Sequence, residues 1–107
     1  GSGDGGCFTT VGDVRTLWLA VLGGRILPEP LVRRMTAPTI AATADALGYG
    51  LGVWLHASGV LELHGYDAGV AIRSMHDPRT GTTWTVASNV SGGTRAMERV
   101  LDDDLAR

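Results

Sequence analysis

The sequence contains no lysine, because all nine of its basic residues are arginines. A mechanism that uses a lysine base or a lysine Schiff base is therefore excluded within these 107 residues. The single cysteine, Cys7, cannot form an internal disulfide, and an unpaired thiol beside glycines is more often a packing residue than a nucleophile. This cysteine content leaves the compartment of the protein open.

Strong charge of either sign is also absent, since nine basic and 11 acidic residues give a formal net charge of −2. Without a run of arginines, the chain lacks the positive surface expected for binding nucleic acid or an anionic membrane. No apolar run reaches the roughly 18 residues that a membrane span requires. We therefore expect no nucleic-acid partner and no membrane span in this chain.

The sequence has no motif that is typical of a metal or nucleotide site. His56, His64 and His76 stand at spacings that fit no ligand signature, and His56 and His76 are expected on the solvent side of strands. The acidic run 102–104 is typical of a solvated helix end. We expect no metal and no cofactor.

Three helices are predicted from the spacing of apolar residues. Thr10 and Asp13 have the spacing of a capping box, and an apolar face follows over residues 14–22. A second helix of about two turns is expected between Pro28 and Pro38. A third helix follows Gly92 and should lie on the sheet, with an apolar stripe formed by Met97, Val100, Leu101 and Leu105.

Four strands are predicted between the second and third helices, where alternating apolar residues are separated by turn residues. Their expected ranges are 49–56, 60–65, 70–76 and 82–90. The order favours an α+β fold, an antiparallel sheet of about four strands flanked by helices. Such a sheet has two open edges, so we expect an N-terminal segment or a second copy of the chain to complete it.

Four segments, taken in order, resemble the C-terminal half of the serine β-lactamase-like superfamily, which includes class C β-lactamases, DD-peptidases and related esterases. They are the glycine-rich helix start at residues 5–13, the Tyr-Gly-Leu-Gly-Val-Trp segment 49–54, the His-Gly-Tyr-Asp-Ala-Gly segment 64–69 and the last hairpin, 77–89. The resemblance covers about 85 residues, and it implies the C-terminal part of a β-lactamase-like or transpeptidase-like fold.

This resemblance implies acyl transfer on a lactam, amide or ester through a nucleophilic serine that a lysine and a tyrosine help to activate. The superfamily carries these residues in Ser-x-x-Lys and Tyr-x-Asn motifs, and neither motif occurs in this sequence. We therefore expect residues 1–107 to form a single partial domain, with the nucleophile upstream. The chain alone should be inactive, and its partners should be the N-terminal part of the enzyme and a small-molecule acyl substrate.

In the superfamily, the first side chain of the third segment holds substrate charge or assists proton transfer, and a following backbone N–H helps to form the oxyanion hole. The resemblance implies that His64 takes the first role and the N–H of Asp67 the second. Gly65, Tyr66 and Gly69 are then expected to bind the substrate. Tyr66 departs from the pattern, because glycine is expected where the backbone passes close to the nucleophile.

Two other interpretations stay open. The chain is alternatively a non-catalytic, penicillin-binding-protein-like fragment or interaction domain, in which Tyr66 narrows the cleft. His64 is alternatively an ordinary half-buried histidine. Strand alternation places His64 on the same face as Glu62 and opposite to Leu61 and Leu63, so it should point toward the cleft or the solvent.

Overall fold

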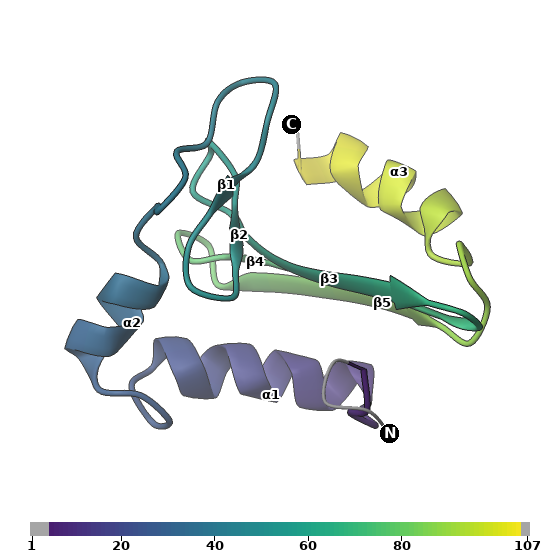
Figure 1. Ribbon diagram of the computed structural model, residues 1–107, viewed down its shortest axis with the longest axis horizontal. Helices are drawn as coiled ribbons and strands as arrows, with labels where there is room; N and C mark the ends of the chain where they lie inside the picture. Colours follow the sequence, from purple (N-terminus) through teal and green to yellow (C-terminus); the bar gives the residue numbers. More distant parts are fainter. Residues whose placement is uncertain (1–4, 106–107) are drawn as a thin grey trace.

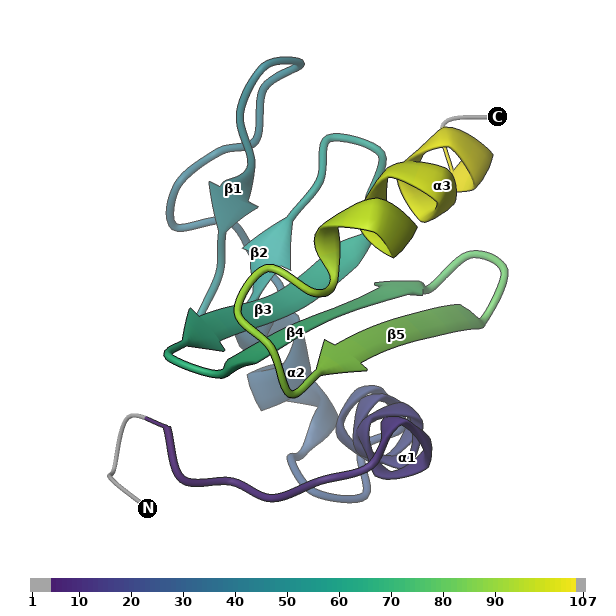
Figure 2. The same ribbon diagram turned by 90° about the vertical axis from the view of Figure 1, so that its right-hand side faces the viewer.

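The computed structural model describes residues 5–105, which form one antiparallel sheet with helices on both of its faces (Figures 1 and 2). This arrangement confirms the expected α+β class, with five strands instead of about four. The elements in chain order are α1 (Val11–Leu22), α2 (Glu29–Met35), β1 (Gly48–Tyr49), β2 (Trp54–Leu55), β3 (Leu61–Asp67), β4 (Val70–Asp77), β5 (Thr82–Ser88) and α3 (Arg95–Leu105).

The sheet is a meander, because each strand pairs with the next strand along the chain in the order β1-β2-β3-β4-β5. Strand β3 pairs with β4 along its whole length, from Leu61 opposite His76 to Asp67 opposite Val70. Strand β2 covers only the first part of the other edge of β3, through Leu61 and Glu62. The rest of that edge has no strand beside it among the described residues.

The single strand predicted over residues 49–56 is wrong, because this segment forms two short strands joined by a turn. The Gly50 N–H donates to the carbonyl of Val53 at 2.8 Å, and Gly52 has a φ of +79° that favours glycine. A side chain at Gly50 would collide with the carbonyl oxygen of Met35 at the end of α2. The glycines that resembled alternate strand positions therefore serve a tight turn against a helix end.

Helix α1 begins as its sequence predicts, because the Thr10 hydroxyl accepts the backbone N–H of Asp13 at 3.1 Å. Its buried face, Val14 and Trp18, packs on the sheet and forms the hydrophobic core. The core also includes Val53, Leu55 and Leu61. The indole of Trp18 reaches through this core and donates to the hydroxyl of Ser74 in β4 at 2.9 Å.

Helix α3 lies across the sheet from α1, so the helices cover both faces (Figures 1 and 2). Arg73 of β4 bonds Asp102 of α3 at 2.8 Å and ties the helix to the strand. The apolar stripe of α3 is not fully covered, because Met97 and Val100 are 51% and 55% exposed. No described helix has the length and apolar character needed to cross a membrane.

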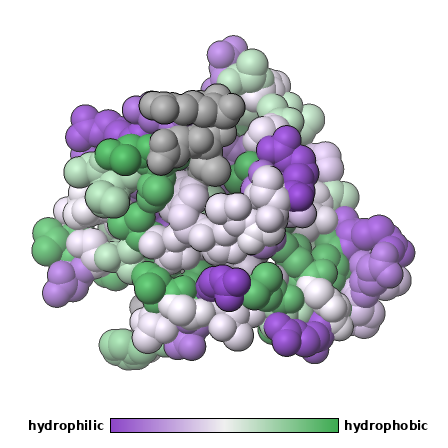
Figure 3. Space-filling view, turned by 180° about the vertical axis from the view of Figure 1, so that it is seen from behind, coloured by the Kyte–Doolittle hydropathy of each residue, from purple (hydrophilic) through white to green (hydrophobic). Residues whose placement is uncertain are grey.

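Several large hydrophobic side chains remain on the surface. Seen from behind, hydrophobic residues lie in separate groups among hydrophilic ones (Figure 3). The most exposed members of this set are Phe8, Ile26, Ile40, Tyr66, Val90 and Val100. Scattered apolar side chains are ordinary on a protein surface, and this face shows them in separate groups.

Candidate functional site

The alternation of β3 separates its core residues from its polar residues. Leu61 and Leu63 face α1 and the core, whereas Glu62 and His64 face the α3 side. The structure therefore places His64 away from the leucines, as strand alternation predicts. Arg73 stands directly opposite His64 in the ladder, so β4 adds a cationic side chain to the same face.

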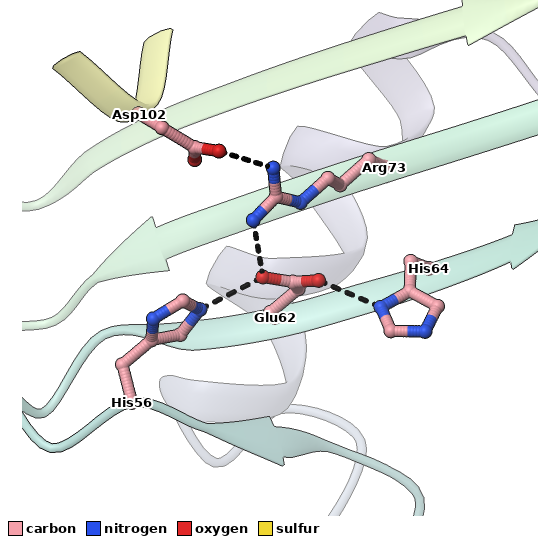
Figure 4. Close-up of polar contacts among 5 residues, drawn as sticks. All are labelled: His56, Glu62, His64, Arg73 and Asp102. Atoms are coloured by element: carbon pink, nitrogen blue, oxygen red, sulfur yellow. Dashed lines mark hydrogen bonds and ion pairs between the residues drawn. The ribbon is translucent and has the colours of Figure 1, made fainter. Parts of the chain in front are cut away.

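Glu62 is the centre of a polar cluster on this face (Figure 4). Its side chain is 2% exposed, and its two carboxylate oxygens receive different partners. Oε1 lies 2.6 Å from Nδ1 of His64, whereas Oε2 lies 2.7 Å from Nε2 of His56 and 3.0 Å from Nη2 of Arg73. Asp102 binds the other end of the Arg73 guanidinium, so the cluster links β3, β4 and α3 with His56, the residue that follows β2.

The electrostatics of this cluster keep Glu62 ionised. Burial acts to raise the pKa of Glu62, but hydrogen bonds from His56, Arg73 and His64 and the charge of Arg73 act against it. The net effect of burial, the three hydrogen bonds and the charge of Arg73 lowers the pKa of Glu62 to about 2. The two acidic partners likewise raise the pKa of Arg73, although burial alone would lower it. At neutral pH the cluster therefore contains a carboxylate that accepts hydrogen bonds from both histidines.

His64 is held on two sides. One ring nitrogen bonds Glu62, and the ring lies parallel to the indole of Trp54, with centroids 5.1 Å apart and planes 9° apart. Trp54 is itself supported by an edge-to-face contact with Tyr49 at 4.7 Å. The side chain of His64 stays 42% exposed. The nitrogen Nε2 lies on the far side of the ring from Glu62 (Figure 4) and forms no hydrogen bond with any described residue.

A pocket of about 410 Å³ lies beside His64, between β3, β4 and the start of α3. Three of the residues predicted to form the site, namely His64, Gly65 and Tyr66, line it. The pocket is also lined by charged side chains, which are Glu62, Arg73, Arg95 and Glu98. The structure thus brings the first three residues of the third segment to one concave surface.

Asp67 and Gly69 lie at the hairpin turn beyond this pocket. Asp67 is the last residue of β3 and stands opposite Val70, and its carboxylate accepts the N–H of Ala68 at 2.7 Å. Gly69 has a φ of +78°, and its N–H donates to the Ser91 hydroxyl at 2.8 Å. That hydroxyl donates to the carbonyl of Asp67 at 3.0 Å. The turn is therefore anchored, and the oxyanion role of the Asp67 N–H stays a prediction.

Sequence reasoning gave no role to Glu62, and it placed His56 and His76 on the solvent side. His56 bonds Glu62, and His76 is 4% exposed, stacked on Trp18 and bonded to the Thr83 hydroxyl at 2.7 Å. The Glu-x-His spacing of residues 62–64 is the signal that points to the cluster, because it puts both side chains on one strand face. Within the described part of the chain, no group of three or more His, Cys, Asp or Glu side chains could hold a metal ion.

Solved structures of similar fold include a penicillin-binding protein and an amidohydrolase. A penicillin-binding protein from Bacillus halodurans is 27% identical over 89% of this chain, with a TM-score of 0.79. A D-stereospecific amidohydrolase from Streptomyces sp. is 24% identical over 75% of this chain, with a TM-score of 0.61. At this identity the likeness supports a shared fold and nothing further. This chain spans 30% of the first structure and 25% of the second.

No protein-family model matches the sequence, and no curated protein matches it. The two structural likenesses confirm the resemblance found in the sequence motifs. The chain has the fold of part of the serine β-lactamase-like superfamily.

Proposed function

We propose that this chain is the C-terminal part of a β-lactamase-like serine hydrolase, which transfers the acyl group of a lactam, amide or ester. The observation that carries the proposal is the structural match to a penicillin-binding protein over 89% of this chain. The same chain contains, in order, the four segments that resemble the superfamily. Neither observation names a substrate, since one fold supports many chemistries. The substrate is therefore proposed only as a small acyl compound.

The proposal assigns the serine nucleophile and its base to an N-terminal part of the same enzyme, which completes the partial domain. Two features support such a partner. The outer edge of β5 has no neighbouring strand among the described residues, and an open edge favours pairing with another segment. The exposed apolar side chains, including Met97 and Val100 of α3, offer further contact area.

Within the proposed site, His64 faces the substrate with Nε2 and either binds substrate charge or assists proton transfer. The N–H of Asp67 is proposed to donate to the developing oxyanion, a contribution on the order of 3 kcal/mol in a working site. Gly65, Tyr66 and Gly69 are proposed to bind the substrate. The pocket beside His64, Gly65 and Tyr66 supports this arrangement.

The test is covalent labelling of the full gene product, including whatever sequence precedes residue 1. A fluorescent penicillin and a nitrophenyl ester are the probes, and peptide mapping locates the acylated residue. We expect an acyl adduct on a serine of a Ser-x-x-Lys motif upstream of residue 1 and no adduct on residues 1–107 alone. A gene product without that motif, or one that neither probe acylates, would contradict the proposal.

A non-catalytic binding module is the second candidate, and Tyr66 is the observation that favours it. Tyr66 is 79% exposed at the pocket, where the superfamily has glycine. A side chain there reduces the space left for a substrate. Replacing Tyr66 with glycine separates the two candidates, because acylation that appears only in the Tyr66→Gly variant identifies a closed cleft, whereas acylation of the unmodified protein identifies an enzyme.

A further inference from the structure

We propose that Glu62 is the positioning residue of this site: it fixes the Nδ1–H tautomer of His64 and thereby presents Nε2 as a proton acceptor. The tautomer assignment stands on the hydrogen-bond geometry around an ionised Glu62, whereas its use in acyl transfer rests on the proposed function. Glu62 borders the pocket, but its side chain is only 2% exposed and both of its carboxylate oxygens are already bonded to protein groups (Figure 4). It acts through the ring that it holds.

The division of the two carboxylate oxygens carries the tautomer assignment. An ionised carboxylate only accepts hydrogen bonds, so each nitrogen in contact with it must carry a proton. At His64 the contacting atom is Nδ1, 2.6 Å from Oε1, and at His56 it is Nε2, 2.7 Å from Oε2. In their neutral forms the two histidines are therefore held in opposite tautomers, and Nε2 of neutral His64 keeps its lone pair.

Arg73 keeps the Oε2 oxygen of Glu62 as a hydrogen-bond acceptor. Its guanidinium donates to Oε2 at 3.0 Å and is held from behind by Asp102 at 2.8 Å. An arginine has donors only, so the oxygen beside it must remain an acceptor. Trp54 adds a second restraint by covering one face of the His64 ring. The orientation of His64 is thus determined by contacts from three strands and one helix.

This arrangement has a consequence for proton transfer. When Nε2 of neutral His64 accepts a proton from a hydroxyl group, the ring becomes an imidazolium and keeps its Nδ1–H bond to the Glu62 carboxylate. The carboxylate stabilises the new positive charge without taking the proton itself. The same proton can then pass from Nε2 to a leaving group, which returns His64 to its starting state.

Glu62→Gln is the informative variant, because an amide has one acceptor oxygen and one donor NH₂ group. Arg73 requires the oxygen on its own side, where His56 also donates. The NH₂ group must then face Nδ1 of His64, which can accept a hydrogen bond only by giving up its proton. We therefore expect His64 to change to the Nε2–H tautomer while His56 keeps its tautomer, so that the outward atom of His64 becomes a donor.

The experiment measures ¹⁵N shifts of selectively labelled histidines in the full gene product at a pH where both rings are neutral. The unmodified protein should show Nδ1–H at His64 and Nε2–H at His56, and Glu62→Gln should exchange the protonated nitrogen of His64 alone. Glu29→Gln, which removes an exposed carboxylate on α2, is the matched control and should change neither histidine. In an acyl-transfer assay, Glu62→Gln should lower kcat by roughly 10- to 1000-fold with a smaller change in KM.

An Nε2–H tautomer at His64 in the unmodified protein would overturn the proposal, and this measurement needs no variant to fold. A folded Glu62→Gln variant that keeps Nδ1–H at His64 would overturn it as well. If both tautomers are as expected but the unmodified protein transfers no acyl group, the proposed function fails and the positioning role of Glu62 remains.

Discussion

The imidazole of His64 lies parallel to the indole of Trp54, with ring centroids 5.1 Å apart. Trp54 stands opposite Glu62 in the ladder between β2 and β3, so one strand face presents the carboxylate and its neighbour presents the aromatic surface. The Tyr-Gly-Leu-Gly-Val-Trp segment 49–54 therefore has a local purpose beyond its resemblance to a family motif. Its tight turn returns the chain so that an indole covers the histidine.

Replacing Trp54 tests whether this stacking holds His64. Trp54→Phe keeps an aromatic face and should cost less unfolding free energy than the roughly 0.5–1.5 kcal/mol that one aromatic pair contributes. Trp54→Ala removes the face and should cost more, while also broadening the ¹⁵N signals of His64 because the ring gains a second orientation. Chemical denaturation and histidine NMR measure the two effects. Sharp, unshifted His64 signals in a folded Trp54→Ala variant would contradict the restraint.

Removing the imidazole tests the role proposed for His64. His64→Ala should lower acyl-transfer turnover in the full gene product by roughly 10- to 1000-fold, the range for acid–base or positioning groups. The fold should persist, because the side chain is 42% exposed and lies outside the core. Steady-state kinetics and circular dichroism give the comparison, with Glu29→Gln as the control. Unchanged kinetics would end the catalytic assignment of His64.

Local sequence signals predicted much of the fold. The capping spacing of Thr10 and Asp13 located the start of α1, and the alternation around Leu61 and Leu63 located β3 and its core face. The turn at residues 50–53 was missed because glycines between apolar residues imitate strand alternation. Its cause, the approach of the Met35 carbonyl, lies outside the segment itself.

The candidate site was less accessible to sequence reasoning, for a similar reason. His64 could be singled out from its segment, but its orientation depends on Arg73 and on Asp102, which lie far along the chain and meet only through the sheet pairing and the α3 contact. His76 was misplaced because a strand position alone does not reveal that Trp18 covers it. The burial of a polar residue on a strand therefore cannot be predicted until the element that packs over that strand is known.

The buried bond between Trp18 and Ser74 predicts a stability effect that is separate from the site. Ser74 is fully buried, and its hydroxyl also pairs with that of Thr85 at 2.8 Å. Ser74→Ala leaves the indole N–H without its acceptor, which should cost about 1–3 kcal/mol of unfolding free energy. Ser58→Ala, at an exposed turn position, is the control and should stay within about 0.5 kcal/mol. Equal denaturation midpoints for the two variants would contradict the prediction.

The lowered pKa of Glu62 predicts how stability depends on pH. Folding lowers the pKa of Glu62 from 4.5 to about 2, so the folded state holds the carboxylate more strongly ionised than the unfolded state does. The resulting stabilisation is fully present above pH 4.5 and is lost as the pH falls toward 2, with a total of at most about 3 kcal/mol. Urea denaturation between pH 5 and pH 2 measures it, and Glu62→Gln should be less stable above pH 4.5 and show a flatter profile below it. Glu29→Gln should keep the steep profile, and a Glu62→Gln variant with the same slope would show that Glu62 is not the titrating group.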